Sequence, residues 1–164
     1  MGGGSYRIPF DLPVGPGGLV PKLDLVYSTG LGNGPFGLGW ALGVPFVERK
    51  RRTPFAPPGE EEYALSGAET LVRLEDGRFA PYTQPVLQTF AFDGDEWTAI
   101  APNLVEFRFG HAGASRVAAM VDGAPRVQRW LLDRATFPGN RTIDYEYEAD
   151  GAGRLLRRIT WSVR

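Results

Sequence analysis

The chain has 164 residues, of which 43% are hydrophobic and 23% are charged, and its formal net charge is −1. This composition is typical of one folded domain, and the balanced charge gives no electrostatic case for nucleic-acid binding, which calls for a basic face. The sequence has no cysteine, which excludes disulfides and thiolate metal sites, and its 22 glycines and 14 prolines indicate many turns.

Alternation of apolar and polar residues predicts two strands near the N-terminus. Tyr6, Ile8 and Phe10 alternate with more polar neighbours, and Pro9 favours an edge position because proline has no amide hydrogen to donate. The turn residues PVGPGG follow, and a second alternating stretch then covers residues 23–27.

Glycines dominate the next segment, GLGNGPFGLGW, part of which satisfies the pattern G-x-G-x-x-G. That pattern cradles a pyrophosphate only where a strand enters it and a helix leaves it. No helix is expected here, because Gly43 and Pro45 interrupt the following residues. We therefore reject a dinucleotide site. We expect Gly30 to Gly39 to adopt positive φ beside Phe36 and Trp40, and Trp40 to anchor the segment by packing under the sheet.

The middle of the chain has the pattern of successive hairpins. Asp76-Gly77 is a strong turn signal, and Phe90 and Phe92 are expected to face Trp97 across a turn at residues 93–96. Residues 105–109 alternate cleanly and predict another strand. The stretch SRVAAMV is compatible with either a strand or a short helix.

The C-terminal part predicts further strands. VQRWLL is followed by RTIDYEYE, which places Ile143, Tyr145 and Tyr147 on one face. A turn at residues 150–153 leads to a last strand, whose apolar residues are Leu155, Ile159, Trp161 and Val163. About nine short strands with turns every 8–12 residues predict an all-β fold.

Few residues suggest chemistry. His111 is the single histidine, and without cysteines or a nucleophile elbow it is interpreted as a loop residue. The acidic residues at 93–96 could bind calcium, but an EF-hand requires more ligands, so a hairpin turn is favoured. The basic run ERKRR is balanced by a later EEE and is interpreted as a solvated loop. A buried role, rather than a sugar-stacking platform, is expected for the four tryptophans, Trp40, Trp97, Trp130 and Trp161.

Three blocks of the sequence resemble the SpvB-type family, which comprises the B component of bacterial Tc toxin complexes (TcB) and the N-terminal region of SpvB virulence proteins. The blocks are P-G-G-x-x-P-x-L-x-L-x-Y-S at residues 16–28, G-N-G-x-F-G-x-G-W at residues 32–40 and L-S-G-x-E-x-L at residues 65–71. Residues 126–161 are similar to the family's W-x-L…G-N-x-x-I-x-Y-x-Y segment, and residues 147–155 resemble a YD repeat of Rhs proteins. The structural motif residues marked by this resemblance are Gly32, Asn33, Gly34, Phe36, Gly37, Gly39, Trp40, Ser66 and Gly67.

The resemblance implies an all-β fold in which short antiparallel strands and hairpins form an open, twisted sheet of a shell-like, TcB- or Rhs-type architecture. It implies a non-enzymatic role, in which the chain contributes to a β-sheet shell that encloses a toxin polypeptide and helps deliver it. The expected partners are other shell segments or toxin-complex chains and the enclosed polypeptide. No cofactor, no metal and no nucleic acid is expected.

Other functions have less support from the residues. SpvB proteins also carry an ADP-ribosyltransferase domain, and Glu60-Glu61-Glu62 formally satisfies its E-x-E motif, but the accompanying Arg and Ser-Thr-Ser-like strand are not placed. We interpret the triplet as a solvated acidic turn. A surface module that binds carbohydrate or protein through exposed Trp and Tyr is the alternative function. Shielding of all four tryptophans would favour the shell, and exposure of two or more would favour the binding module. No residue constellation supports a small hydrolase or transferase.

We expect a single domain over residues 1–164, with a Gly/Pro-rich block at 1–75, hairpins at 76–125 and a YD-repeat-like block at 126–164. No apolar run is long enough to cross a membrane, so no membrane insertion by this segment is expected. The resemblance implies a secreted protein, and since no charged-then-apolar signal peptide is visible, any export is expected to use another route.

Overall fold

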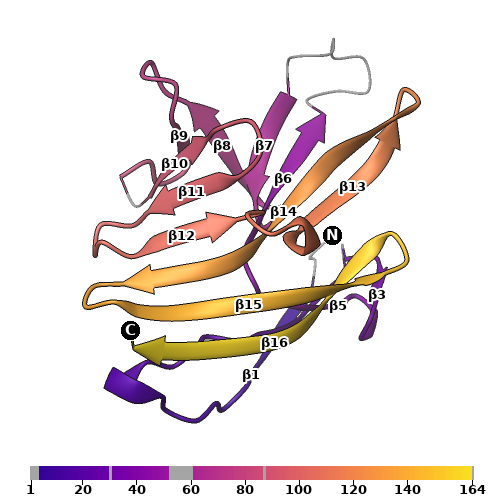
Figure 1. Ribbon diagram of the computed structural model, residues 1–164. Helices are drawn as coiled ribbons and strands as arrows, with labels where there is room; N and C mark the ends of the chain where they lie inside the picture. The colour runs from indigo at the N-terminus through magenta and orange to yellow at the C-terminus, as the bar shows by residue number, and fades with distance from the viewer. Residues whose placement is uncertain (1–3, 30, 52–60, 87, 164) are drawn as a thin grey trace.

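The computed structural model describes residues 4–29, 31–51, 61–86 and 88–163, and its regular structure is almost entirely β-strand (Figure 1). Two short 3₁₀ turns are the exceptions among these residues, η1 (Pro16–Gly18) and η2 (Gly113–Ser115). The prediction of an all-β fold is therefore confirmed.

The N-terminal strands form a small sheet of their own. Its order is β1 (Ser5–Pro9), β2 (Asp24–Ser28) and β5 (Trp40–Leu42), with all pairs antiparallel. β1 lies at the edge, where Pro9 is tolerated. Between β2 and β5 the chain forms a separate two-stranded hairpin of β3 (Asn33–Gly34) and β4 (Gly37–Leu38).

The rest of the chain forms one large antiparallel sheet that closes on itself. Its first strands follow one another as a meander, and the long strand β14 then pairs with both ends of that meander, β6 and β12. The strands are β6 (Phe46–Arg51), β7 (Glu61–Leu65), β8 (Glu69–Arg73), β9 (Phe79–Pro81), β10 (Thr89–Phe92), β11 (Trp97–Ile100), β12 (Glu106–Phe109), β13 (Arg116–Val121), β14 (Ala124–Phe137), β15 (Arg141–Asp150) and β16 (Gly153–Val163).

Closure depends on the length of β14. One edge of this strand pairs first with β13 and then with β12, and the opposite edge pairs first with β6 and then with β15. Strands β6 to β12 together with β14 therefore make an eight-stranded ring, whereas an open sheet was expected. β13, β15 and β16 extend outside this ring, and β15 and β16 run beside β14 as an open, twisted continuation (Figure 1).

Aromatic side chains fill the interior of the ring. Tyr63, Phe79, Phe92, Trp97 and Trp130 come from five different strands, yet their ring centroids lie 4.7–6.1 Å apart. Side chains from strands around a closed sheet can meet in this way only inside it. Phe90 and Phe92 were both expected to face Trp97 across the turn: Phe92 pairs directly with Trp97 in the register, whereas Phe90 pairs with Ala99.

Two charged segments differ from their interpretation as solvated turns or loops. The run ERKRR begins inside β6, and the following acidic residues begin β7, where Lys50 pairs with Glu62 and Arg49 with Tyr63. A run of charged residues in the sequence indicates a solvated loop. Here opposite charges on neighbouring strands lie across from each other, and this pairing stabilises the same residues within a sheet. Glu60 and the rest of residues 52–60 lie outside the described residues.

Two other expectations are settled by the C-terminal strands. SRVAAMV, which was compatible with a helix, forms strand β13 and pairs with β14. In β16, Leu156 rather than Leu155 packs against the core, together with Ile159 and Trp161. The reason is a bulge opposite Glu146 and Tyr147, which reverses the alternation of the strand.

Candidate functional site

The glycine-rich motif is a tight hairpin with a defined backbone. β3 and β4 are joined by Pro35 and Phe36, and Gly34 pairs with Gly37 across the hairpin. Gly37 and Gly39 have φ of 97° and 81°, values at which a side chain is strained. Positive φ is therefore present at two of these positions. Gly30 lies outside the described residues.

Gly39 is also a point of close approach. A Cβ there would lie 2.6 Å from Cε2 of Tyr27 and 3.1 Å from the carbonyl oxygen of Ser28. The neighbouring Trp40 packs on Tyr27 with a ring-centroid separation of 5.2 Å and is half-buried. Trp40 thus anchors the hairpin to β2 of the small sheet, and it does not belong to the buried core of the large one.

Ser66 and Gly67 form a second tight turn, between β7 and β8. Both have positive φ, 50° and 77°, as a type I′ turn requires. The amide of Ser66 donates to the carbonyl of Phe46, and the ammonium of Lys50 donates to the carbonyl of Gly67. The turn is therefore fastened to β6, apart from the β3–β4 hairpin.

Arg129 of β14 lies near residues of both motifs. Its guanidinium lies 3.3 Å from Glu48 and 5.1 Å from the ring centroid of Phe46, both of which lie near the Cβ position of Gly67. Arg129 also lines a hollow of about 450 Å³ together with Asn33 and other residues. The sequence motifs marked the glycines, but they did not indicate this arginine.

The tryptophans divide into two groups. Trp97 and Trp130 are 0% and 1% exposed, while Trp40 and Trp161 are half-buried. Trp161 is covered by the N-terminal segment, because a Cβ on Gly15 would lie 2.0 Å from its ring. Two indoles are thus fully shielded and two are partly exposed, which lies between the outcome expected for the shell and the outcome expected for the binding module.

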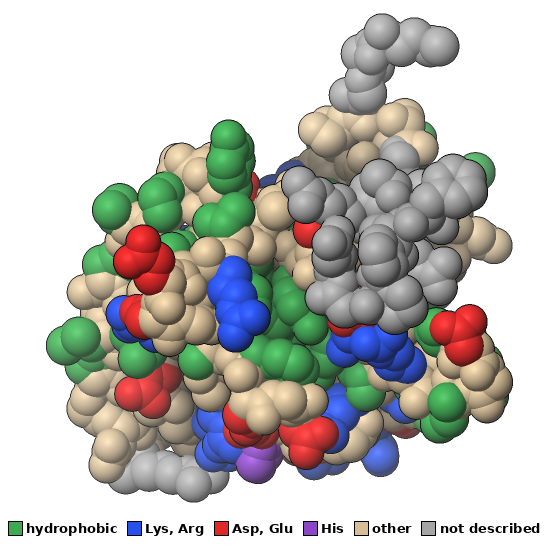
Figure 2. Space-filling view, turned by 90° about the horizontal axis from the view of Figure 1, so that it is seen from above, with side chains coloured by type: hydrophobic (Ala, Val, Ile, Leu, Met, Phe, Trp, Pro, Cys, Tyr) green, Lys and Arg blue, Asp and Glu red, His purple; other side chains and the backbone are tan. Residues whose placement is uncertain are grey.

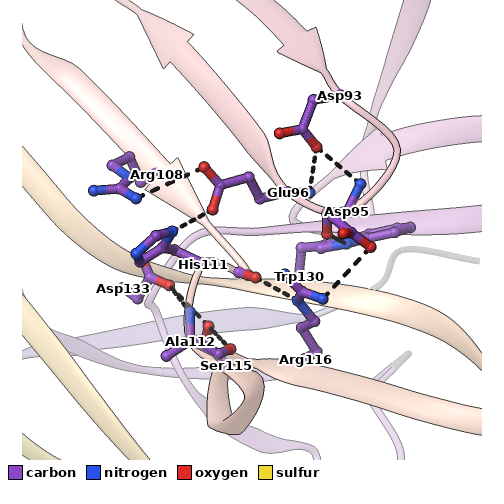
Figure 3. A network of polar contacts seen from close by, with 11 residues as sticks. Asp93, Asp95, Glu96, Arg108, His111, Ala112, Ser115, Arg116, Trp130 and Asp133 are labelled. Carbon is purple, nitrogen blue, oxygen red and sulfur yellow. Dashed lines mark hydrogen bonds and ion pairs between the residues drawn. The ribbon is translucent and has the colours of Figure 1, made fainter.

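A polar cluster gathers at one rim of the ring (Figure 3). Glu96 accepts a hydrogen bond from His111 at 2.5 Å and lies 3.7 Å from Arg108. Asp93 accepts the amides of Asp95 and Glu96, which forms the predicted turn and lowers the pKa of its carboxyl group, chiefly through the bond from Glu96. Figure 2 shows the histidine at the edge of a face whose centre is hydrophobic, with acidic side chains beside it.

The same cluster contains a serine, a histidine and an aspartate, but they do not form a catalytic triad. Ser115 is fully buried and bonds to the carboxylate of Asp133 and to the carbonyl of Ala112. His111 bonds to Glu96 instead. A triad serine needs access to substrate and a histidine within hydrogen-bond reach, whereas Ser115 is buried and its side-chain partner is the carboxylate of Asp133. Its bonds close the η2 turn against β14 (Figure 3).

Inside the ring, Arg49 and Glu61 form an ion pair against the aromatic side chains. The guanidinium of Arg49 lies 5.6 Å from the ring centroid of Tyr63 and 5.5 Å from that of Trp130, and burial lowers its pKa. Glu61 also pairs with Arg126 at 2.7 Å. Glu61, the middle residue of the acidic triplet, is thus engaged by two arginines. Alternation from the buried Val47 predicts that Arg49 faces inward, a signal that the charge-run interpretation overlooked.

Among the described residues no group of three or more His, Cys, Asp or Glu side chains is placed to hold a metal ion. Within the same part of the chain, the structure has no helix with the length and apolarity needed to cross a membrane.

An exposed apolar row lies on the small sheet. Tyr6, Ile8 and Phe10 share one face of the N-terminal segment and are 64%, 41% and 44% exposed. β1 pairs with β2 on one side, and no described strand pairs with its other side. An apolar row beside an unpaired edge is the strongest interaction feature of this region.

Comparisons of the sequence with known proteins find one family and several curated relatives. Residues 1–88 match the family model SpvB, described as the Salmonella virulence plasmid 65kDa B protein. Curated relatives include the mono(ADP-ribosyl)transferase SpvB of Salmonella typhimurium and that of Salmonella dublin, each 26% identical over 181 residues. The alignments cover 90% of this chain and 30% of each relative, so the chain spans about 30% of their length.

Solved structures share the fold. The N-terminal domain of the effector SpvB from Salmonella typhimurium strain LT2 has a TM-score of 0.71 at 22% identity, with 94% of this chain and 63% of that chain covered. The TcdB2-TccC3-Cdc42 structure has a TM-score of 0.77 at 19% identity and the Photorhabdus luminescens Tc holotoxin pore 0.73 at 20%; each match covers 96% of this chain and 9% of the other.

Proposed function

Because the model of the SpvB family matches more than half of its residues, the chain belongs to that family, and we propose that it is a non-enzymatic structural module of a bacterial toxin complex. In this role the chain contributes strands to a β-sheet shell that encloses a toxin polypeptide and helps deliver it outside the producing cell. We propose further that residues 1–164 act as one module. Contact of Gly15 with Trp161 and burial of Leu19 in the core support this unity.

The main observation that supports this proposal is the free edge of β1. Phe10 donates its amide to Leu23 of the chain leading into β2, so by alternation the backbone N–H and C=O of Arg7 point away from β2. These groups can pair with another strand, and the exposed row of Tyr6, Ile8 and Phe10 would then pack under neighbouring sheet. Pro9 removes one donor from the same edge, which limits the pairing to a short strand.

The remaining geometry favours structure over catalysis. The charged side chains inside the ring and at its rim are engaged with one another, and Ser115 is buried beneath its own turn. The matched relatives are named as mono(ADP-ribosyl)transferases, and this chain aligns with 30% of their length. We propose that the aligned part serves as scaffold in those proteins as well.

A chimera tests the proposed role. This chain would replace the structurally matching 9% of the chain in the TcdB2-TccC3-Cdc42 structure. Protease protection of the enclosed polypeptide would be measured after purification. We expect the chimera to assemble and to protect its cargo. A folded chimera that leaves the cargo accessible would contradict the shell role.

Two further measurements complete the test. The double variant Tyr6→Lys and Ile8→Lys places charges on the exposed row, and we expect it to fold alone but to weaken assembly of the chimera. The isolated chain, incubated with labelled nicotinamide dinucleotide and a cell extract, should transfer no ADP-ribose. Transfer that depends on Glu62 would contradict the non-enzymatic proposal.

A further inference from the structure

A hollow of about 450 Å³ lies where the β3–β4 hairpin meets the tip of the β15–β16 hairpin. Figure 1 shows β3 beside this tip, although the two segments are more than a hundred residues apart. Its lining includes Asn33 and Gly34 of the first hairpin, Asp150 and Arg154 of the second, and Arg129 of β14. The glycine-rich motif therefore shares the lining of one hollow with two arginines.

The guanidinium groups of the two arginines differ in their hydrogen-bond and ion-pair partners. Arg129 has a carboxylate partner in Glu48 and stacks on Phe46. Arg154 donates from Nη1 to the carbonyl of Gly153, and no carboxylate of the described residues pairs with it. Its Nε is buried and has no hydrogen-bond partner among the described residues. Arg154 keeps guanidinium N–H donors that no carboxylate of the described residues accepts, and such donors favour an added acceptor.

We propose that this hollow binds a carboxylate side chain of a polypeptide partner. The planar fork of Arg154 matches a carboxylate, and the apolar side chains of Val117 and Leu131 can contact the methylene groups of a glutamate. Asp150 lines the same hollow, so its negative charge opposes a doubly charged phosphate more than a single carboxylate. The identification of the partner as a polypeptide rests on the proposed function.

Titration of the isotope-labelled chain with a short poly-glutamate peptide tests the site by nuclear magnetic resonance. We expect shifts at the Nε–Hε resonance of Arg154 and at the amides of Asn33 and Gly34. Poly-glutamine of the same length is the matched control and should leave them in place. Arg154→Gln should weaken binding about tenfold or more, and Asp150→Asn should strengthen it because a repelling charge is removed.

Arg158→Gln is the matched arginine control, since Arg158 lies on the same strand, is 60% exposed and does not line the hollow. It should bind the peptide as the parent chain does. Equal loss in Arg158→Gln and Arg154→Gln would overturn the site, as would shifts that inorganic phosphate produces and poly-glutamate does not. If the peptide fails while the TcdB2 chimera still protects its cargo, the hollow is excluded and the shell role stands.

Discussion

Gly110 lies directly against the indole of Trp130: a Cβ on Gly110 would be 2.3 Å from Cδ1 of that ring. Gly110 also has a φ of 73° and donates its amide to the carbonyl of Leu131. We predict that Gly110→Ala lowers the free energy of unfolding by about 3 kcal/mol, because both strain and overpacking oppose the methyl group. Gly123→Ala, at a φ of 80° with nothing within 4 Å, isolates the strain and should cost about 1 kcal/mol. If chemical denaturation gave equal losses of unfolding free energy for the two variants, the contact between Gly110 and Trp130 would not contribute.

The two fully buried tryptophans offer a second comparison. Trp130 donates its indole N–H to the carbonyl of Asp95 at 2.8 Å, whereas the N–H of Trp97 has no partner among the described residues. Trp→Phe substitution removes similar volume at both sites. We therefore predict that Trp130→Phe costs about 1 kcal/mol more stability than Trp97→Phe, measured by urea denaturation. The reverse order would show that the bond to Asp95 does not contribute.

The ion pair between Arg49 and Glu61 predicts that the effects of substituting both residues on the free energy of unfolding are not additive. Glu61→Gln leaves the half-buried Arg49 with a weaker partner and should cost about 2–4 kcal/mol, discounted for the remaining exposure of both groups. Arg49→Met removes the cation but fills the aromatic pocket with an apolar chain. We expect the double variant to be more stable than the sum of the single changes predicts. Strict additivity in the thermodynamic cycle would exclude coupling between the two side chains.

The glycine hairpin predicts a ranking of alanine variants. Gly39→Ala should be the most destabilising glycine change in the hairpin, by about 2–3 kcal/mol, since it combines positive φ with the contact to Tyr27. Gly37→Ala, with positive φ and open space, should cost about 1 kcal/mol, and Gly32→Ala should be nearly neutral. Trp40→Ala should cost more than Asn33→Ala because it removes the contact with Tyr27. Denaturation midpoints for the series test this order.

Buried tyrosines predict a loss of stability at alkaline pH. Burial raises the pKa of Tyr145 to about 12, and burial also raises the pKa of Tyr147, whose hydroxyl donates to the carbonyl of Leu132. Below about pH 10 both folded and unfolded chains keep these protons, so the contribution to stability is complete. Between about pH 10 and 12 the unfolded chain ionises first, and stability should fall with rising pH.

The measurement is the urea midpoint across this alkaline range. Tyr145→Phe cannot ionise, so its midpoint should fall less steeply than that of the parent chain. An identical slope in both proteins would show that Tyr145 does not cause the loss. At neutral pH, Tyr147→Phe should cost about 1 kcal/mol because the bond to Leu132 is lost.

Much of the fold follows from local patterns in the sequence. Alternation identified the strands around Phe90, Phe107 and Ile143, and Asp76-Gly77 marks a turn that the structure contains. These features depend on residues close in sequence, since a strand's two faces and a tight turn's φ values are set locally. The glycine hairpin belongs to the same class, because Gly37 and Gly39 are required by backbone geometry wherever the hairpin is placed.

Only the tertiary structure decided how the distant segments meet. β14 has two edges and enough length to pair with β6, β12, β13 and β15, and no local pattern specifies which partners take which edge. The ring that results turns Arg49 from an apparent solvent residue into an interior one. It also brings Arg154 to the glycine hairpin. Such contacts depend on closing long loops between segments, and the free energy that selects them comes from burial and pairing across the whole sheet.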